Sequence, residues 1–124
     1  MNFRKTESMD IFESSWFGVA ERKMDWAAAR QRILTENVAN ADTPGFVGRD
    51  VVSFDEHLSR NEAGARTEVD SDEASNAWGG SFDGNRVVLE EQSIMSTETA
   101  GQYQMASRLY RKGHELLSLA VSSK

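Results

Sequence analysis

Residues 36–46 read ENVANADTPGF, and this stretch marks the end of a long helical pattern. Ile33, Asn37 and Asn40 follow each other at steps of four and three, so one line of a helix would carry all three. Asn is a poor residue inside a helix but suits helix ends, where its amide satisfies unpaired backbone groups. A buried Asn can also fix the register between helices. The residues by themselves leave both roles open.

A sharply specified turn follows the two asparagines. Thr43 precedes the single proline of the chain and is therefore pushed toward extended geometry. Pro44 and Gly45 suit the two central positions of a type II turn, in which Gly45 takes a positive φ. We predict a corner where the helix ends and Phe46 anchors the departing chain, although an ordinary helix stop has the same pattern.

Upstream of this corner, residues 11–41 place apolar side chains at steps of three and four, which predicts one long helix. About 30 residues at a rise of 1.5 Å make a rod of roughly 45 Å. Its expected seam residues are Phe17, Met24, Leu34 and Val38, beside Trp16 and Trp26. This aromatic load is large for one helix of a two-helix hairpin and weakly favours packing against other subunits.

Residues 87–121 predict a second long helix with a weaker apolar stripe. Polar Gln92 and Thr99 interrupt the stripe, and Gly101 and Gly113 suggest either close helix packing or local flexibility. The expected seam residues are Met95, Tyr103, Ala106, Leu109, Tyr110, Leu116 and Leu117.

The segment between the helices predicts little buried structure. Residues 46–58 contain a short apolar cluster that fits a short strand or an extended packing arm, whereas residues 59–86 are polar, acidic and rich in Gly and Ser. We therefore expect a mainly α fold in which two long terminal helices form a coiled-coil-like hairpin, joined by an extended arm and a flexible acidic loop. The expected divisions are 1–46 for the N-terminal assembly helix and corner, 47–86 for the arm and loop, and 87–124 for the C-terminal assembly helix.

Charge and composition exclude several classes of function. The 124 residues carry a net charge of −6, and residues 50–91 hold eleven acids against three bases. Nucleic-acid binding needs clustered Lys and Arg, so we expect no nucleic-acid partner. The absence of Cys excludes disulfides and thiolate chemistry. No run approaches the roughly 20 apolar residues that span a bilayer, and the N-terminus lacks the pattern of a cleaved secretory signal.

The sequence predicts neither an enzyme nor a cofactor or metal site. His57 and His114 belong to no ligand cluster, and residues 70–81 lack the Gly and Glu that a calcium loop needs at its sixth and twelfth positions. Glu90 and Glu91 diverge on a helix and make a poor acid–base pair. Interaction chemistry remains: the apolar stripes are either the core of an intramolecular hairpin or seams for other subunits.

The corner also carries a resemblance to a known family. The stretch NVANADTPGF (37–46) resembles the N-terminal signature of bacterial flagellar axial proteins, the rod and hook subunits. In that signature a helix ends in Asn-x-x-Asn, followed by a small residue, a polar residue, Thr, Pro, Gly and an aromatic. The matching residues are Asn37, Ala39, Asn40, Asp42, Thr43, Pro44, Gly45 and Phe46.

The C-terminal part narrows this resemblance. Residues 82–121 are similar to the C-terminal segment of proximal rod proteins of the FlgB type, through Asp83-Gly84-Asn85, Val88 to Glu91, Tyr103-Gln104 and the stretch from Leu109 to Leu117. The short chain fits as well, because hook and distal-rod subunits carry larger inserted domains. The cluster Ser93, Ser96, Thr97 and Thr99 departs from an apolar seam.

The resemblance implies a structural subunit of the flagellar basal-body rod in the periplasmic space. Such subunits are exported by the flagellar type III apparatus without a cleaved signal, and their terminal helices pack around an export channel. Implied partners are copies of the chain itself, other rod proteins and the export-gate adaptor at the rod base. Ile11, Phe12 and Trp16 are candidates for export recognition, although the same residues fit the helix stripe. The alternative is a small helical export chaperone or a secreted adaptor module with a self-contained hairpin.

Overall fold

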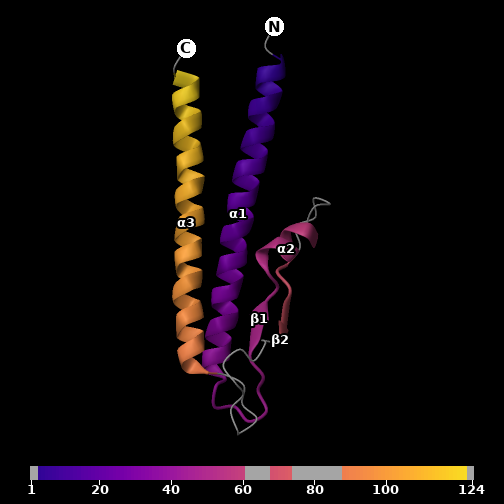
Figure 1. Ribbon diagram of the computed structural model, residues 1–124, viewed down its shortest axis with the longest axis vertical. Coiled ribbons are helices and arrows are strands. Elements are labelled where there is room, and N and C mark those ends of the chain that lie inside the picture. The colour runs from indigo at the N-terminus through magenta and orange to yellow at the C-terminus, as the bar shows by residue number, and fades with distance from the viewer. Residues whose placement is uncertain (1–2, 61–67, 74–87, 123–124) are drawn as a thin grey trace.

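The structure is a computed structural model that describes residues 3–60, 68–73 and 88–122, with side chains described from residue 15 onward. Two long helices, α1 (Phe3–Ala39) and α3 (Leu89–Ser122), run antiparallel and side by side, so the start of α1 and the end of α3 lie at one end of the molecule (Figure 1). The predicted mainly α hairpin is confirmed. The first helix begins earlier than expected, at Phe3 instead of residue 11.

Small side chains form much of the interface between the two helices. Ala27 is fully buried, Leu34 is 1% exposed and Ala20 is 7% exposed on α1, while Thr99 is fully buried and Ala106 is 3% exposed on α3. Small residues let two helix axes approach closely, but each buries little apolar area. The core of the hairpin is therefore narrow.

A compact arm follows the corner and packs on α1 (Figure 1). It comprises β1 (Arg49–Val51), α2 (Phe54–Arg60) and β2 (Ser71–Glu73). The two strands pair antiparallel, with Asp50 opposite Asp72. The expected short strand is present, but the expected arm folds further than predicted, because α2 occupies its second half.

A side-chain cap explains why α2 begins where it does. The Glu56 backbone N–H donates to Ser53 Oγ at 3.2 Å, and the His57 N–H donates to the Ser53 carbonyl at 2.9 Å. Ser followed three residues later by Glu is the spacing of a capping box. Strand β2 lies inside the segment expected to be a flexible acidic loop, and most of that segment falls outside the described residues.

Candidate functional site

The corner has the geometry that its sequence predicts. Gly45 has a φ of 76°, and the Phe46 N–H donates to the Thr43 carbonyl at 3.1 Å, which closes a four-residue turn around Pro44 and Gly45. A positive φ at the third position is the mark of a type II turn. The predicted turn is confirmed.

Asn40 ends the helix just before this turn. Its backbone N–H and its Nδ2 both donate to the Glu36 carbonyl, at 3.0 and 2.9 Å, and its own carbonyl accepts the Thr43 N–H at 3.0 Å. These bonds satisfy backbone groups that the last helical turn leaves unpaired. Asn40 therefore takes the helix-end role that the sequence left open.

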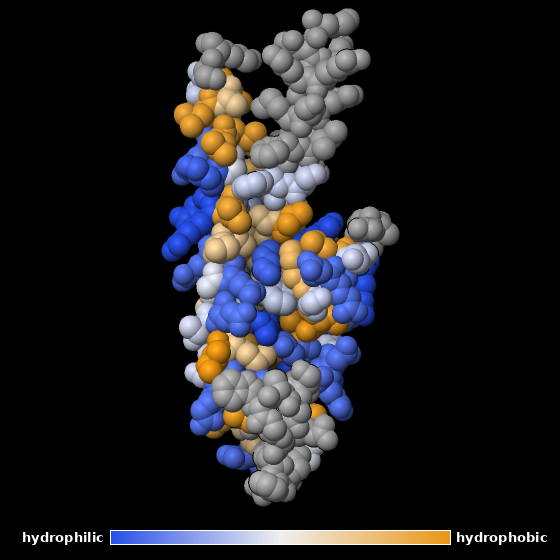
Figure 2. Space-filling model, in the orientation of Figure 1, coloured by the Kyte–Doolittle hydropathy of each residue, from blue (hydrophilic) through white to orange (hydrophobic). Residues whose placement is uncertain are grey.

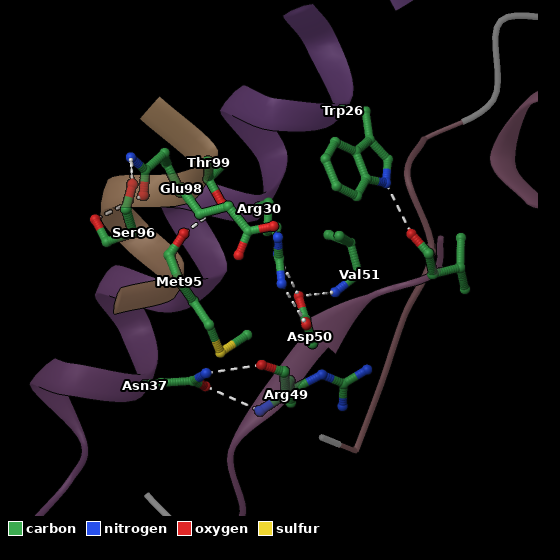
Figure 3. A network of polar contacts seen from close by, with 12 residues as sticks. Trp26, Arg30, Asn37, Arg49, Asp50, Val51, Met95, Ser96, Glu98 and Thr99 are labelled. Atoms are coloured by element: carbon green, nitrogen blue, oxygen red, sulfur yellow. Dashed lines mark hydrogen bonds and ion pairs between the residues drawn. The ribbon is translucent and has the colours of Figure 1, made fainter. Parts of the chain in front are cut away.

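Asn37 has the role of a buried Asn that fixes the register, because its side chain joins three elements. Its side chain is 1% exposed, and its Nδ2 donates to the Arg49 carbonyl at 2.7 Å and to Gln92 Oε1 at 2.9 Å. Its Oδ1 accepts the Arg49 N–H at 2.9 Å (Figure 3). One buried amide thus ties α1 to β1 and to α3, and it fixes their relative positions.

A second polar pair, Gln31 of α1 and Ser96 of α3, crosses the helix interface. Gln31 Nε2 donates to the Ser96 carbonyl at 2.9 Å, and Ser96 Oγ donates back to Gln31 Oε1 at 3.0 Å (Figure 3). Thr99 Oγ1 donates to the Met95 carbonyl of its own helix at 2.7 Å. Ser96 and Thr99, which depart from an apolar seam, are thus accommodated by hydrogen bonds, as buried polar groups require, whereas Ser93 and Thr97 are exposed.

The arm is held to α1 by contacts that sequence reasoning missed. Trp26 Nε1 donates to the Val52 carbonyl at 2.7 Å, and Arg30 contacts both carboxylate oxygens of Asp50, at 3.1 and 3.2 Å (Figure 3). Lys23 Nζ lies 4.3 Å from the ring centre of Trp26. Burial, followed by the neighbouring Arg30 charge, lowers the pKa of Lys23. Only the fold reveals these pairs, because no spacing rule links α1 to β1.

Close packing marks the other end of the hairpin. Gly113 is buried, and a Cβ at this position would meet Trp16 Cδ1 at 2.7 Å and Phe17 Cε1 at 3.0 Å. Trp16 Nε1 donates to the Leu109 carbonyl at 2.9 Å. The ring of His114 lies 4.4 Å from that of Phe17. Gly113 therefore has the packing reason that the sequence suggested.

The remaining predicted residues divide by exposure. Of the seam set, the buried members are Phe17, Leu34 and Ala106; the half-buried members are Met24, Met95, Tyr110 and Leu117; and the exposed members are Val38, Tyr103, Leu109 and Leu116. Of the remaining corner residues, Phe46 is half-buried, whereas Ala39, Asp42, Thr43, Pro44 and Gly45 are exposed. Trp16 is half-buried, and the side chains of Ile11 and Phe12 lie outside the described part.

The described residues hold no cluster of three or more side chains suited to a metal ion. His57 is buried within the arm, at 5% exposure, and His114 packs against the Phe17 and Tyr110 rings. Within the same part of the chain, no helix combines the length and the apolar character that crossing a membrane would require.

Comparisons with known proteins agree with this picture. Residues 19–46 match the family model described as flagella basal body rod protein, and the matched segment ends at Phe46 of the corner. The flagellar basal body rod protein FlgB of Agrobacterium fabrum is 26% identical over 122 residues, covering 85% of this chain and 91% of the relative. FlgB of Borrelia hermsii is 42% identical over 52 residues, covering 42% of this chain and 37% of the relative.

The helical hairpin, the corner and these matches support a structural subunit of the flagellar basal-body rod. Within that class, the match over 85% of the chain confirms the resemblance to rod proteins of the FlgB type.

Proposed function

We propose that this chain is a subunit of the proximal rod, which assembles with copies of itself and with other rod proteins through α1 and α3. In this role it transmits torque, and its helices line the export channel. One observation carries the proposal: the folded hairpin leaves large apolar residues of its helices in solvent. The exposed fractions are 45% for Val19, 46% for Leu109 and Leu116, 63% for Leu119 and 64% for Met105.

This exposure supplies a driving force for assembly. Burial of apolar surface contributes about 25 cal/mol per Å², and exposed side chains that gather on one helix gain this energy together. Figure 2 shows apolar residues near the C-terminal end of α3, the end that lies beside the start of α1. The proposal therefore assigns these helix ends to contacts between subunits.

The polar interface inside the hairpin suits export. Asn37–Gln92 and Gln31–Ser96 fix how the helices align, but they replace apolar area that would stabilise the monomer. We propose that a monomer of modest stability unfolds for passage through the flagellar type III apparatus and refolds at the rod. The N-terminal residues Ile11, Phe12 and Trp16 are proposed for recognition by that apparatus, and the export-gate adaptor is proposed as the neighbour at the rod base.

Deletion and complementation test this function. A flagellated strain that lacks the gene for this chain should lose motility while its export apparatus still assembles, and the wild-type chain should restore swimming. The chain should also be recovered in purified basal bodies. A deletion strain that swims normally, or basal bodies without this chain, would contradict the proposal and favour the chaperone alternative.

A further inference from the structure

The exposed side of α3 carries a second apolar line, separate from the residues that face α1. Met105, Leu109, Leu116 and Leu119 follow each other at steps of four, seven and three residues, and each is between 46% and 64% exposed. This spacing is that of a seam that packs against another helix, with Lys112 at the polar position of the repeat. We call the four apolar residues the α3 stripe.

The first half of the α3 stripe forms one wall of an apolar groove. Met105 and Leu109 line this groove of about 590 Å³ together with Trp16 and Val19 of α1 and Phe54 of α2. The second half of the stripe lies beyond the groove, toward the C-terminal end of α3, where Figure 2 shows apolar residues. One helix therefore offers an apolar groove and, next to it along the chain, an apolar ridge.

We infer that the free chain forms a closed dimer, in which the α3 stripes of two copies pack antiparallel about a twofold axis. The ridge of each copy, Leu116 and Leu119, enters the groove of the other copy. Apolar side chains gain from contact with an apolar surface, so the surface that covers the stripe must itself be apolar. A second copy supplies that surface, because each copy contributes one ridge and one groove.

The spacing of the stripe sets the register of the two helices. A twofold axis that passes between residues 110 and 111 places Met105 of one copy beside Leu116 of the other. It also places Leu109 of one copy beside the methylene stem of Lys112 of the other. A Lys stem packs on apolar surface while its ammonium stays in water, so this position needs no buried charge.

Charged residues beside the stripe favour the antiparallel orientation. Arg108 and Glu115 are both exposed and lie seven residues apart, about two turns, so they share one side of α3. In the antiparallel pair, Arg108 of each copy comes beside Glu115 of the other, once at each end of the contact. A parallel pair in register would instead place Arg108 beside Arg108 and Lys112 beside Lys112, which repulsion between like charges disfavours.

The ion pairs that the chain already has are kept in this arrangement. Lys112 Nζ lies 3.6 Å from Glu115 Oε2, and both side chains are exposed. A carboxylate has two oxygens that accept hydrogen bonds, so Glu115 can bind Lys112 of its own helix and Arg108 of the other copy. Among the residues that the structure describes, no salt bridge occupies Arg108.

The size of the contact makes this dimer weak and reversible. About a dozen residues of each copy would touch, against roughly 20–30 on each side of a stable complex. A twofold contact uses the same surface on both copies and is closed, so no third copy adds to it. The dimer therefore covers the apolar surfaces of the free chain without starting a filament. The inference goes beyond the proposed function and does not depend on it, since it concerns the chain before it enters any assembly.

Cysteine cross-linking tests the antiparallel register, because the chain contains no Cys. Purified Met105→Cys and Leu116→Cys chains are mixed and oxidised with copper phenanthroline. We expect a cross-linked dimer from the mixture and little from either chain alone, since the two copies of position 105, or of position 116, lie about 16 Å apart along the helices. The matched control mixes Leu116→Cys with Gln104→Cys, an exposed neighbour that points off the stripe, and should not cross-link.

Charge reversal gives a second readout on the purified chain. Arg108→Glu should weaken self-association in sedimentation by about tenfold, because two attractive contacts with Glu115 become repulsive in each dimer. Arg111→Glu changes the net charge equally but lies on another side of α3, so it should associate like the wild type. Both arginines are exposed, so the circular dichroism of each variant should match the wild type.

Several results would overturn the dimer. A chain that stays monomeric in sedimentation at about 1 mM would leave a helix of another protein as the occupant of the stripe. Cross-linking of Met105→Cys alone as strong as that of the mixture would indicate a parallel seam. Cross-linking equal to the Gln104→Cys control, or equal weakening by Arg108→Glu and Arg111→Glu, would show that the contact is unspecific. The proposed function fails separately, in a deletion strain that swims normally, and the dimer of the purified chain would still stand.

Discussion

Asn37 of α1 donates a hydrogen bond to Gln92 of α3 at 2.9 Å, across 55 residues of sequence, and both side chains are at most 4% exposed. The Asn37 side-chain amide also donates to the Arg49 carbonyl and accepts a hydrogen bond from the Arg49 N–H. The corner, the arm and the second helix therefore meet at one side chain. A buried polar bond between two helices specifies one alignment, since any other alignment leaves buried groups unpaired.

Replacing Asn37 should therefore cost more than replacing Asn40. Asn37→Ala leaves Gln92 Oε1 and two backbone groups of Arg49 without partners, which we expect to lower the free energy of unfolding by about 2–4 kcal/mol. Asn40→Ala removes an exposed helix-end bond and should cost about 1 kcal/mol. Urea unfolding followed by circular dichroism measures both, and an equal effect of the two changes would contradict the register role.

Two glycines of α3 should respond in opposite directions to the same substitution. A Cβ at Gly101 meets nothing within 4 Å, so Gly101→Ala should raise the free energy of unfolding by about 1 kcal/mol through helix propensity. At Gly113 a Cβ would press on Trp16 and Phe17, so Gly113→Ala should lower it by about 1–3 kcal/mol. Thermal unfolding of both variants checks this, and a stabilised Gly113→Ala chain would show that the helices are not in close contact there.

The turn at Gly45 should tolerate Asn but not Val. With φ at 76°, a β-branched residue is strained, and Gly45→Val should cost about 1–3 kcal/mol and misdirect the chain from Phe46 onward. Asn accepts this backbone region more readily, so Gly45→Asn is the matched control. Swimming of complemented strains reports the consequence for assembly. Normal motility with both Gly45→Val and Asn40→Ala would make the corner an ordinary helix stop.

Glu91 should make stability depend on pH. Burial, followed by the nearby Asp50 charge, raises the pKa of Glu91 in the folded chain. The folded state therefore holds the proton more tightly than the unfolded state, and this stabilisation is lost as the pH rises through the raised pKa. Glu91→Gln should thus unfold at a higher temperature than the wild type at neutral pH, with the difference vanishing below about pH 4.

The exposed neighbour Glu90 supplies the control for this effect. Glu90→Gln removes the same charge from the first turn of α3 without relieving a partly buried carboxylate. It should give no stabilisation at neutral pH, because acidic residues favour the start of a helix. If Glu91→Gln and Glu90→Gln raised the melting temperature equally, the stabilisation would come from the change in net charge and not from the raised pKa of Glu91.

Local chemistry explains what sequence alone could predict. Helix periodicity determines α1 and α3, and Pro44-Gly45 determines the turn, because these patterns act over a few neighbouring residues. Helix α2 was missed although Ser53 and Glu56 carry the capping-box spacing, which was a usable signal. The corner residues also carried the resemblance to the rod family.

Tertiary structure decided the rest. In sequence, Gly101 and Gly113 look alike, and Asn37 fits a helix end as well as Asn40 does. Only the folded hairpin brings Gly113 against Trp16 and Asn37 against Gln92 and Arg49. The pairing of Arg30 with Asp50 arises in the same way, from the docking of the arm on α1. Local sequence sets the length and ends of each helix, but the register of one element on another depends on contacts between residues far apart in the chain.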